Sequence, residues 1–307
     1  MTIEINKIAH LTGHQAAIYA LAPGTQDHFI FSGSVDCLVV QWNLQTYQYD
    51  KIIGRFATPL YAICHIREKQ WLLTGGSDGT VHIMDLENNQ EIKTLDSHSA
   101  QVFNISYSIQ TNSIYTLGGD GILAVYSMDS LTLIKLIHLS EDKVRHLDFN
   151  YKTSEIAITS GKGNIHILDL NTLLKKMVFP GHQLSSNIAR FCPDGKLLLT
   201  GGKDGFLNIW DVGSYELITS IQAHEWAIYD IVYNPEATLF ATASRDKSIK
   251  IWDSKTLELI EIIDRATFDG HQFSVNKLMW STANDYLISA SDDRTIMIWH
   301  IQIISTA

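Results

Sequence analysis

A repeat with a period of 42 residues constrains the fold of this chain more than any other feature. Aromatic or large apolar residues stand at consecutive multiples of 42, namely Trp42, Met84, Tyr126, Leu168, Trp210 and Trp252. An aspartate recurs six residues before most of them, at Asp36, Asp78, Asp120, Asp204 and Asp246. A seventh copy ends at Trp299 after a slip of five residues. Such periods indicate a repeat architecture, in which each unit packs on its neighbours.

Each unit contains three short runs of β-branched and aromatic residues separated by turn signals. In the unit that starts at Gly181, the turns are marked by Pro193-Asp194-Gly195 and Asp204-Gly205. The alternation in Ser248–Asp253 is typical of a strand with one buried face. A fourth run follows each Trp position, for example Glu216–Gln222. Four strands and no helical periodicity predict four-stranded antiparallel blades.

The best units begin with a Gly-His or Ala-His pair and end at a Trp, most often as Trp-Asp. These units start at Gly181, Ala223 and Gly270. Together the two ends resemble the WD-repeat family over nearly the whole chain. The resemblance implies an all-β, seven-bladed β-propeller around a central channel, with residues 1–307 as a single domain. The blade units would begin near residues 13, 55, 97, 139, 181, 223 and 270.

The N-terminal segment Ile3–Leu11 is the expected closure of the ring. It precedes Gly13-His14 just as Glu216–Gln222 precedes Ala223-His224, whereas only eight residues follow Trp299. We therefore predict that Ile3–Leu11 supplies the outermost strand of the last blade. This pairing would cover strand edges that otherwise remain open.

The resemblance assigns a hydrogen-bonded network of His, Ser or Thr, Asp and Trp to each blade. The complete sets are His14, Ser32, Asp36 and Trp42; His182, Thr200, Asp204 and Trp210; His224, Thr242, Asp246 and Trp252; and His271, Ser289, Asp293 and Trp299. A fifth set, His98, Thr116 and Asp120, has Tyr126 in place of Trp. Ser, His and Asp also form hydrolase triads. Five copies favour a structural role, because a catalytic site is usually singular, so we predict no catalytic residues.

Two blades depart from this pattern. Blade two has Phe56 and Met84 in place of His and Trp, but keeps Thr74 and Asp78. Blade four has Ser140, Ile158, Lys162 and Leu168 at the four positions. We expect apolar packing alone to hold these blades. Either a stable ring tolerates the loss of the network, or the loss leaves the two blades free to serve in binding.

The family resemblance places the Gly-His loops and the Asp turns on one rim, called the top face. The residue five positions after each His would start the innermost strand and face the channel mouth. These residues are Tyr19, Tyr61, Phe103, Arg145, Asn187, Tyr229 and Asn276. Several propellers of this family hold a peptide side chain there, often a basic one, and aromatic rings attract cations. Ordinary packing around a water-filled channel is the alternative.

Neighbouring positions on this rim are also unusual. Trp226 and Phe273 stand two residues after a His, and Lys203, Arg245 and Asp292 stand just before a turn Asp. An aromatic centre with charged edges is typical of a protein interface. The slip in the repeat lengthens Ile262–Gly270 on the same rim, where Arg265 and Phe268 would extend the surface unless the insertion is neutral.

Composition excludes several other classes. A net charge of −10 disfavours general nucleic-acid binding, which needs a basic footprint. Three scattered cysteines favour a reducing, cytoplasmic location without disulfides. We find no signal peptide, no apolar run long enough for a membrane span, no metal-site spacing and no phosphate-binding loop, so no metal or cofactor is expected.

The sequence therefore predicts a non-catalytic scaffold that binds a protein or peptide at the top face and channel mouth. The ring is expected to be monomeric and able to join a complex. One alternative is a propeller that binds or hydrolyses a small ligand in its channel. Another is a structural subunit with contacts along the blade sides, for which Leu131–Leu139 is a weak candidate.

Overall fold

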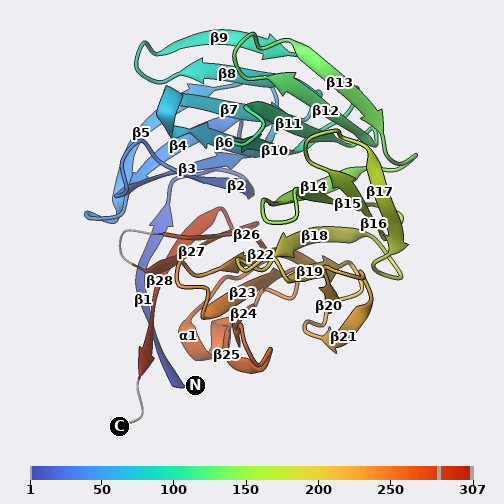
Figure 1. The fold of residues 1–307 in the computed structure, drawn as a ribbon. Helices are drawn as coiled ribbons and strands as arrows, with labels where there is room; N and C mark the ends of the chain where they lie inside the picture. Colours follow the sequence, from blue (N-terminus) through green and yellow to red (C-terminus); the bar gives the residue numbers. More distant parts are fainter. Residues whose placement is uncertain (1, 282–284, 305–307) are drawn as a thin grey trace.

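Seven four-stranded antiparallel sheets make up the part of the chain described by the computed structural model, residues 2–281 and 285–304. The sheets follow one another around a ring as blades (Figure 1). The innermost strands of successive blades contact one another around the channel, and β2 and β26 complete the circle. This arrangement confirms the predicted seven-bladed β-propeller.

In six blades the four strands run outward from the channel in chain order, and in blade seven β26, β27 and β28 are followed by β1. The innermost strands are β2 (Ile18–Pro23), β6 (Leu60–Ile66), β10 (Val102–Ser108), β14 (Val144–Asn150), β18 (Ser186–Phe191), β22 (Ile228–Tyr233) and β26 (Val275–Trp280). The second strands are β3 (Phe29–Ser34), β7 (Trp71–Gly76), β11 (Ser113–Gly118), β15 (Glu155–Ser160), β19 (Leu197–Gly202), β23 (Leu239–Ser244) and β27 (Tyr286–Ser291). The third strands are β4 (Leu38–Asn43), β8 (Val81–Asp85), β12 (Ile122–Ser127), β16 (Asn164–Asp169), β20 (Phe206–Asp211), β24 (Ile249–Asp253) and β28 (Thr295–Ile304). The outermost strands are β5 (Gln48–Arg55), β9 (Gln90–Leu95), β13 (Leu133–His138), β17 (Lys175–Pro180), β21 (Leu217–Gln222), β25 (Leu259–Ile263) and β1 (Thr2–Thr12).

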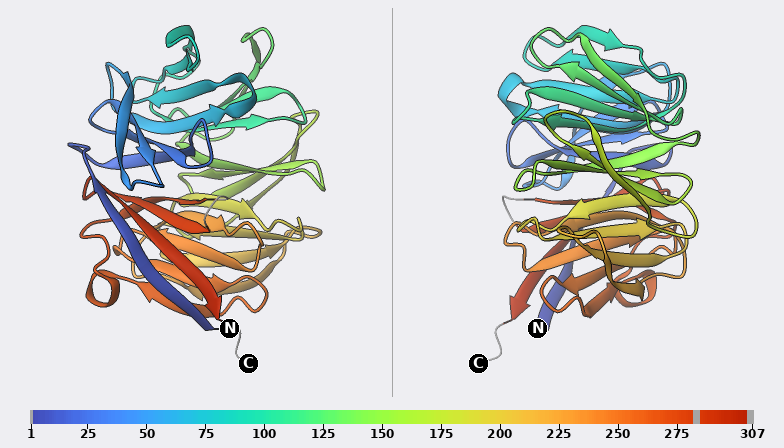
Figure 2. Two further views of the ribbon diagram at one scale, coloured as in Figure 1. Left: turned by 90° about the vertical axis from the view of Figure 1, so that its left-hand side faces the viewer. Right: turned by 45° about the vertical axis from the view of Figure 1, so that its right-hand side comes forward.

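The N-terminal strand closes the ring, as the sequence predicts. β1 pairs antiparallel with β28, from Thr2 opposite Ile304 to Thr12 opposite Thr295. The two strands lie side by side in both figures of the fold (Figures 1 and 2). β1 therefore contains the whole predicted segment Ile3–Leu11 and extends one residue beyond each end.

The apolar core is divided among the contacts between neighbouring blades. One cluster joins Leu239 and Ile251 of blade six to Val275, Leu287 and Trp299 of blade seven, all of them buried. Burial of each such side chain contributes roughly 1.5–3 kcal/mol. Because every blade shares its core with the next, no blade is a complete packing unit by itself.

A short helix lies in the loop that lengthens the last repeat. α1 (Arg265–Phe268) is capped by Asp264, whose side chain accepts a hydrogen bond of 2.8 Å from the Thr267 backbone. A helix of four residues is too short to show helical periodicity, so α1 was not predicted from the sequence. Phe268 packs against the core of blades six and seven, and Arg265 is exposed.

The residue after each turn Asp, or after Lys162 in blade four, adopts a left-handed conformation. The φ angles are 67° at Cys37, 90° at Gly79, 78° at Gly121, 85° at Gly163, 81° at Gly205, 76° at Lys247 and 70° at Arg294. At Gly163, an added Cβ would lie 2.2 Å from the His182 carbonyl oxygen of the next blade. Other residues adopt this φ at the equivalent turns of blades one, six and seven, so it is mainly the close approach that requires glycine at Gly163.

Candidate functional site: the top face and channel mouth

The polar network of blade six contains all four residues that the repeat spacing selects. His224 Nδ1 lies 2.9 Å from Asp246 Oδ2, and His224 Nε2 lies 2.7 Å from Thr242 Oγ1. The Trp252 indole donates a hydrogen bond of 3.0 Å to the same hydroxyl. Because the carboxylate only accepts and the indole only donates, the neutral imidazole donates from Nδ1 and accepts at Nε2 from the hydroxyl.

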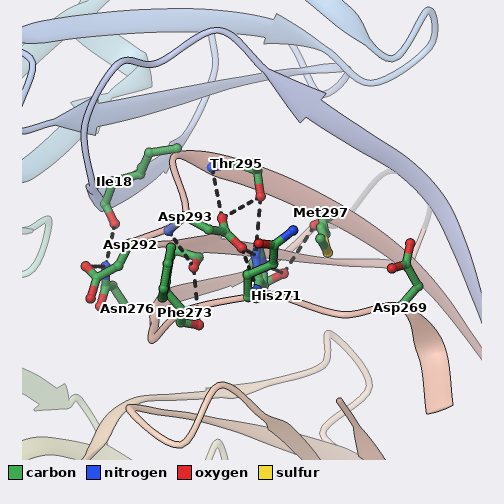
Figure 3. A network of polar contacts seen from close by, with 12 residues as sticks. Ile18, Asp269, His271, Phe273, Asn276, Asp292, Asp293, Thr295 and Met297 are labelled. Carbon is green, nitrogen blue, oxygen red and sulfur yellow. Dashed lines mark hydrogen bonds and ion pairs between the residues drawn. The ribbon is translucent and has the colours of Figure 1, made fainter. Parts of the chain in front are cut away.

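The same contacts recur in other blades. The His Nδ1 to Asp distances are 2.8 Å for His14–Asp36, 3.2 Å for His98–Asp120, 3.0 Å for His182–Asp204 and 2.9 Å for His271–Asp293. An indole completes the network through Trp42, Trp210 and Trp299, and Tyr126 is buried at the equivalent place in blade three. Figure 3 shows the blade-seven network, where Thr295 adds a hydrogen bond of 2.6 Å to Asp293.

Each network ties a top-face loop to a strand turn. Asp246 also accepts from the Glu225 backbone at 3.2 Å and from the Ser248 backbone at 3.0 Å. Burial alone would raise the pKa of Asp246, but hydrogen bonds from His224 and Ser248 outweigh it, so the pKa falls well below its usual value. Burial lowers the pKa of His224 and keeps the imidazole neutral.

The hydroxyl groups of these networks are inaccessible. Ser32, Thr116, Thr200, Thr242 and Ser289 have no exposed surface. A nucleophile must reach its substrate, so this burial agrees with a structural role for the repeated Ser/Thr–His–Asp sets.

The two unusual blades differ from each other. In blade two, Phe56 and Met84 pack beside buried Leu72, in agreement with apolar packing at these positions. Blade four buries Ile158 and Leu168, with no exposed surface on either.

The expectation that blade four is held by apolar packing alone is wrong. Its Glu155 is buried and accepts hydrogen bonds of 2.7 Å from Thr153 and from Tyr215 of blade five, and it also pairs with Lys176. Glu155 lies outside the four repeat positions, so the network template could not reveal it.

All seven residues selected at the channel mouth line one cavity of about 360 Å³. Each is the second residue of its innermost strand, next to a break in the strand register. A continuous row of aromatic contacts runs across three blades. The ring centroids of Tyr19 and Tyr61 are 5.3 Å apart, and those of Tyr61 and Phe103 are 5.9 Å apart. The Arg145 guanidinium then lies 5.0 Å from the Phe103 ring centroid.

Two of the seven residues also bond to a neighbouring blade. Asn187 donates a hydrogen bond of 3.0 Å to the Ile228 carbonyl, and Asn276 donates one of 3.1 Å to the Ile18 carbonyl. Asn276 also donates to Asp292 at 2.8 Å, as Figure 3 shows. These amides are buried and engaged, so the aromatic residues and Arg145 are the more available part of the cavity wall.

Three top-face loops expose a large apolar side chain at the same position. The exposed fractions are 54% for Trp226, 55% for Phe273 and 51% for Leu184. The sequence analysis named the two aromatic residues but missed Leu184. The same spacing of two residues after the His could have found it.

Charged residues deeper in the channel were also missed. Arg190 pairs with Asp148 at 2.9 Å, and Lys277 pairs with Asp230 at 3.0 Å. Asp230 has no exposed surface and accepts a further hydrogen bond of 2.9 Å from the Leu278 backbone. These pairs join neighbouring innermost strands. Asp230 and Lys277 each stand one position after a channel-mouth residue, and Asp148 and Arg190 each stand three positions after one. Charged residues at equivalent positions of neighbouring repeats could have revealed both pairs.

No group of three or more His, Cys, Asp or Glu side chains within residues 2–281 and 285–304 is arranged to hold a metal ion. The same part of the chain contains no helix with the length and hydropathy needed to cross a bilayer.

Comparison with known proteins agrees with this geometry. The family model described as WD domain, G-beta repeat (WD40) matches residues 5–43, 51–85, 174–211, 215–253 and 264–300, more than half of the chain. The chain belongs to the WD40 family. Proteins of this family are typically interaction scaffolds. Most of blades three and four lies between residues 86 and 173, outside these matches.

One relative is the general transcriptional corepressor TUP1 of Saccharomyces cerevisiae. It is 37% identical to this WD40 chain over 54 residues. The shared segment is 18% of this chain and 8% of the relative, so the chain spans only a small part of the relative's length.

Proposed function

We propose that this WD40 chain is a non-catalytic scaffold that binds a protein or peptide at its top face and channel mouth. One observation carries the proposal: the seven residues that differ from blade to blade surround a single cavity of about 360 Å³. Aromatic side chains that line a cavity and stand beside an exposed rim resemble the anchors of protein interfaces.

The geometry also favours binding over hydrolysis. The repeated Ser and Thr hydroxyls are buried, and the channel carboxylates Asp148 and Asp230 are already paired with Arg190 and Lys277. These groups hold the blades together. The three cysteines are free of disulfides, which supports our further proposal of a reducing, cytoplasmic location.

Affinity purification with wild-type and variant proteins tests the proposed site. We expect Phe103→Ala and Tyr229→Ala each to weaken partner binding by roughly 10-fold or more, because each removes an aromatic group from the cavity wall. Tyr49→Ala is the matched control, since Tyr49 is an exposed aromatic on the outermost strand β5. If both cavity variants bind the recovered partner as tightly as the wild type, the partner does not use the channel mouth.

A second candidate function is a structural contact along the blade sides. Leu133, Ile134 and Leu136 are exposed on the outermost strand β13, with fractions of 44%, 55% and 48%. Contiguous exposed apolar residues mark interaction surfaces. Ile134→Glu would then weaken assembly with the partner and leave binding at the channel mouth unchanged, as measured by the same purification.

A further inference from the structure

A second cavity opens on the top face beside blades four, five and six. Its volume is about 410 Å³, and its wall shares Arg145, Asn187 and Tyr229 with the channel cavity. We call it the basic cleft, because cationic side chains dominate its wall. They are Lys143, Arg145, Lys162, Lys203 and Arg245, against the single carboxylate of Asp142. The whole chain has the opposite balance, with 33 acidic and 23 basic residues.

The cations of the basic cleft have no ionic or hydrogen-bonding partner among the described side chains. Within residues 2–281 and 285–304, none of the five forms an ion pair or donates a side-chain hydrogen bond. Elsewhere, Lys176 pairs with Glu155 and Arg190 with Asp148. The Nε atom of Arg145 is buried without an acceptor. An unpaired, partly buried cation lowers stability, so a ligand that supplies the anion would offset a cost built into the fold.

These cations are close enough to repel one another. The positive charge of Arg145 lowers the pKa of Lys143, burial and Lys203 act in the same direction, and the nearby carboxylate of Asp142 offsets only part of this effect. Tyr229 lines the basic cleft together with Arg145 and Arg245. Burial raises the pKa of Tyr229, and Asp292 acts in the same direction, whereas the positive charges of Arg245 and Arg145 oppose this rise. A cluster of like charges is stabilised when an opposite charge binds among them.

The aromatic faces beside the basic cleft already carry cations of this chain. The Arg145 guanidinium lies over Phe103, and the Arg245 guanidinium lies 5.1 Å from the Trp226 ring centroid. A basic side chain entering here would meet occupied rings and like charge. A carboxylate would instead meet guanidinium and ammonium groups that have no other acceptor.

The basic cleft also has an apolar edge. Leu184 lines it and is 51% exposed, and Trp226 is 54% exposed one blade further on. This combination fits a segment in which carboxylates alternate with a large apolar side chain. A nucleic-acid backbone fits less well, because it needs a long basic track and the net charge of this chain is −10.

We propose that the basic cleft binds an acidic segment of a partner protein, with its carboxylates on Lys143, Arg145 and Lys203 and an apolar side chain against Leu184. The inference rests on the proposed top-face function and names the chemistry of the partner.

Fluorescence anisotropy with defined peptides tests this proposal. The probe is a labelled peptide in which pairs of Glu alternate with Leu, and the reference peptides replace Glu by Gln or by Lys. We expect the wild-type chain to bind the Glu peptide at least about 10-fold more tightly than either reference. The affinity should fall as salt concentration rises, because salt screens exposed charges.

The variant Lys162→Gln/Lys203→Gln/Arg245→Gln removes three exposed cations from the basic cleft. We expect it to bind the Glu peptide roughly 10-fold more weakly, with a smaller dependence on salt. The matched control is Lys93→Gln/Lys175→Gln/Lys255→Gln, which makes the same change of net charge at exposed sites outside the cleft. All six positions are exposed, so thermal melting should give similar values for both variants.

Four results would overturn the proposal. They are equal binding of the Glu and Gln peptides by the wild type, equal weakening by the control variant, preference for a phosphoserine peptide that the Glu peptide does not share, and preference for a single-stranded oligonucleotide. None of them affects the proposed function, which fails only if Phe103→Ala and Tyr229→Ala retain wild-type partner binding.

Discussion

Blade four and blade six have the same four-stranded topology but are held together by different contacts. Blade six uses the buried network of His224, Thr242, Asp246 and Trp252. Blade four has lost that network, buries Ile158 and Leu168 instead, and places Lys162 at the position of the turn Asp. Freed from the network, this position contributes a cation to the basic cleft. The hydrogen-bonded network is therefore not needed to form a blade. Where it is absent, a rim position such as Lys162 can carry a different charge.

The largest expected effect tests whether the two blades belong to one cooperative unit. Deleting residues 2–12 removes β1, which pairs along its whole length with β28. We expect a single unfolding transition with Tm lower by more than about 10 °C, because the edge of blade seven and part of its core become exposed. Calorimetry measures this. Two separate transitions would mean that blades four and six unfold independently.

The turn glycine of blade four should be more sensitive than its counterpart in blade six. An added Cβ at Gly163 meets the His182 carbonyl oxygen at 2.2 Å, whereas Lys247 already has a Cβ at the same turn position. We expect Gly163→Ala to lower the free energy of unfolding by about 2–4 kcal/mol. Lys247→Ala is the control and should change it by less than about 0.5 kcal/mol. Urea denaturation measures both, and similar losses would contradict the role of the close approach.

Removal of the turn aspartate should affect blade six but not blade four. Asp246→Ala removes the carboxylate that accepts from the buried His224, leaves only the Ser248 hydroxyl at 3.2 Å, and should cost about 1–3 kcal/mol. Lys162→Ala removes an exposed, unpaired side chain at the equivalent position and should cost less than about 0.5 kcal/mol. The same denaturation experiment compares them. A loss of equal size at both positions would show that the network adds nothing specific.

The smallest effect concerns pH. The pKa values of Asp246 and His224 are both lower in the fold than in the unfolded chain. The unfolded state therefore binds more protons as pH falls, and these groups lose their stabilising contribution, first below about pH 6.5 and then below about pH 4. Asp246→Asn removes the contribution of the carboxylate itself and should show a shallower loss of stability below about pH 4 than the wild type. Urea midpoints measured from pH 7 to pH 3 would show the difference, and parallel curves would contradict it.

The repeat predicted the architecture well because equivalent residues recur at a fixed interval along the chain. One interval of 42 residues located the five His–Asp contacts, the channel-mouth residues and the strand that closes the ring. The sequence did not predict the contacts that lie off the repeat. Glu155 binds Tyr215 of the next blade, and α1 depends on a single cap at Asp264.

The sequence by itself determined the number of blades, their order and the His–Asp contacts within five of them. Those bonds join positions at fixed separations within one unit, so a period is enough to find them. The period also placed side chains from different blades on one rim, but only the tertiary structure decided which of them pair across blades. Lys143, Lys203 and Arg245 come from three consecutive blades and line one cavity, and none of them pairs with an acid within the described residues. Charge neutralisation depends on distances across blades, and no spacing along the chain reports those distances.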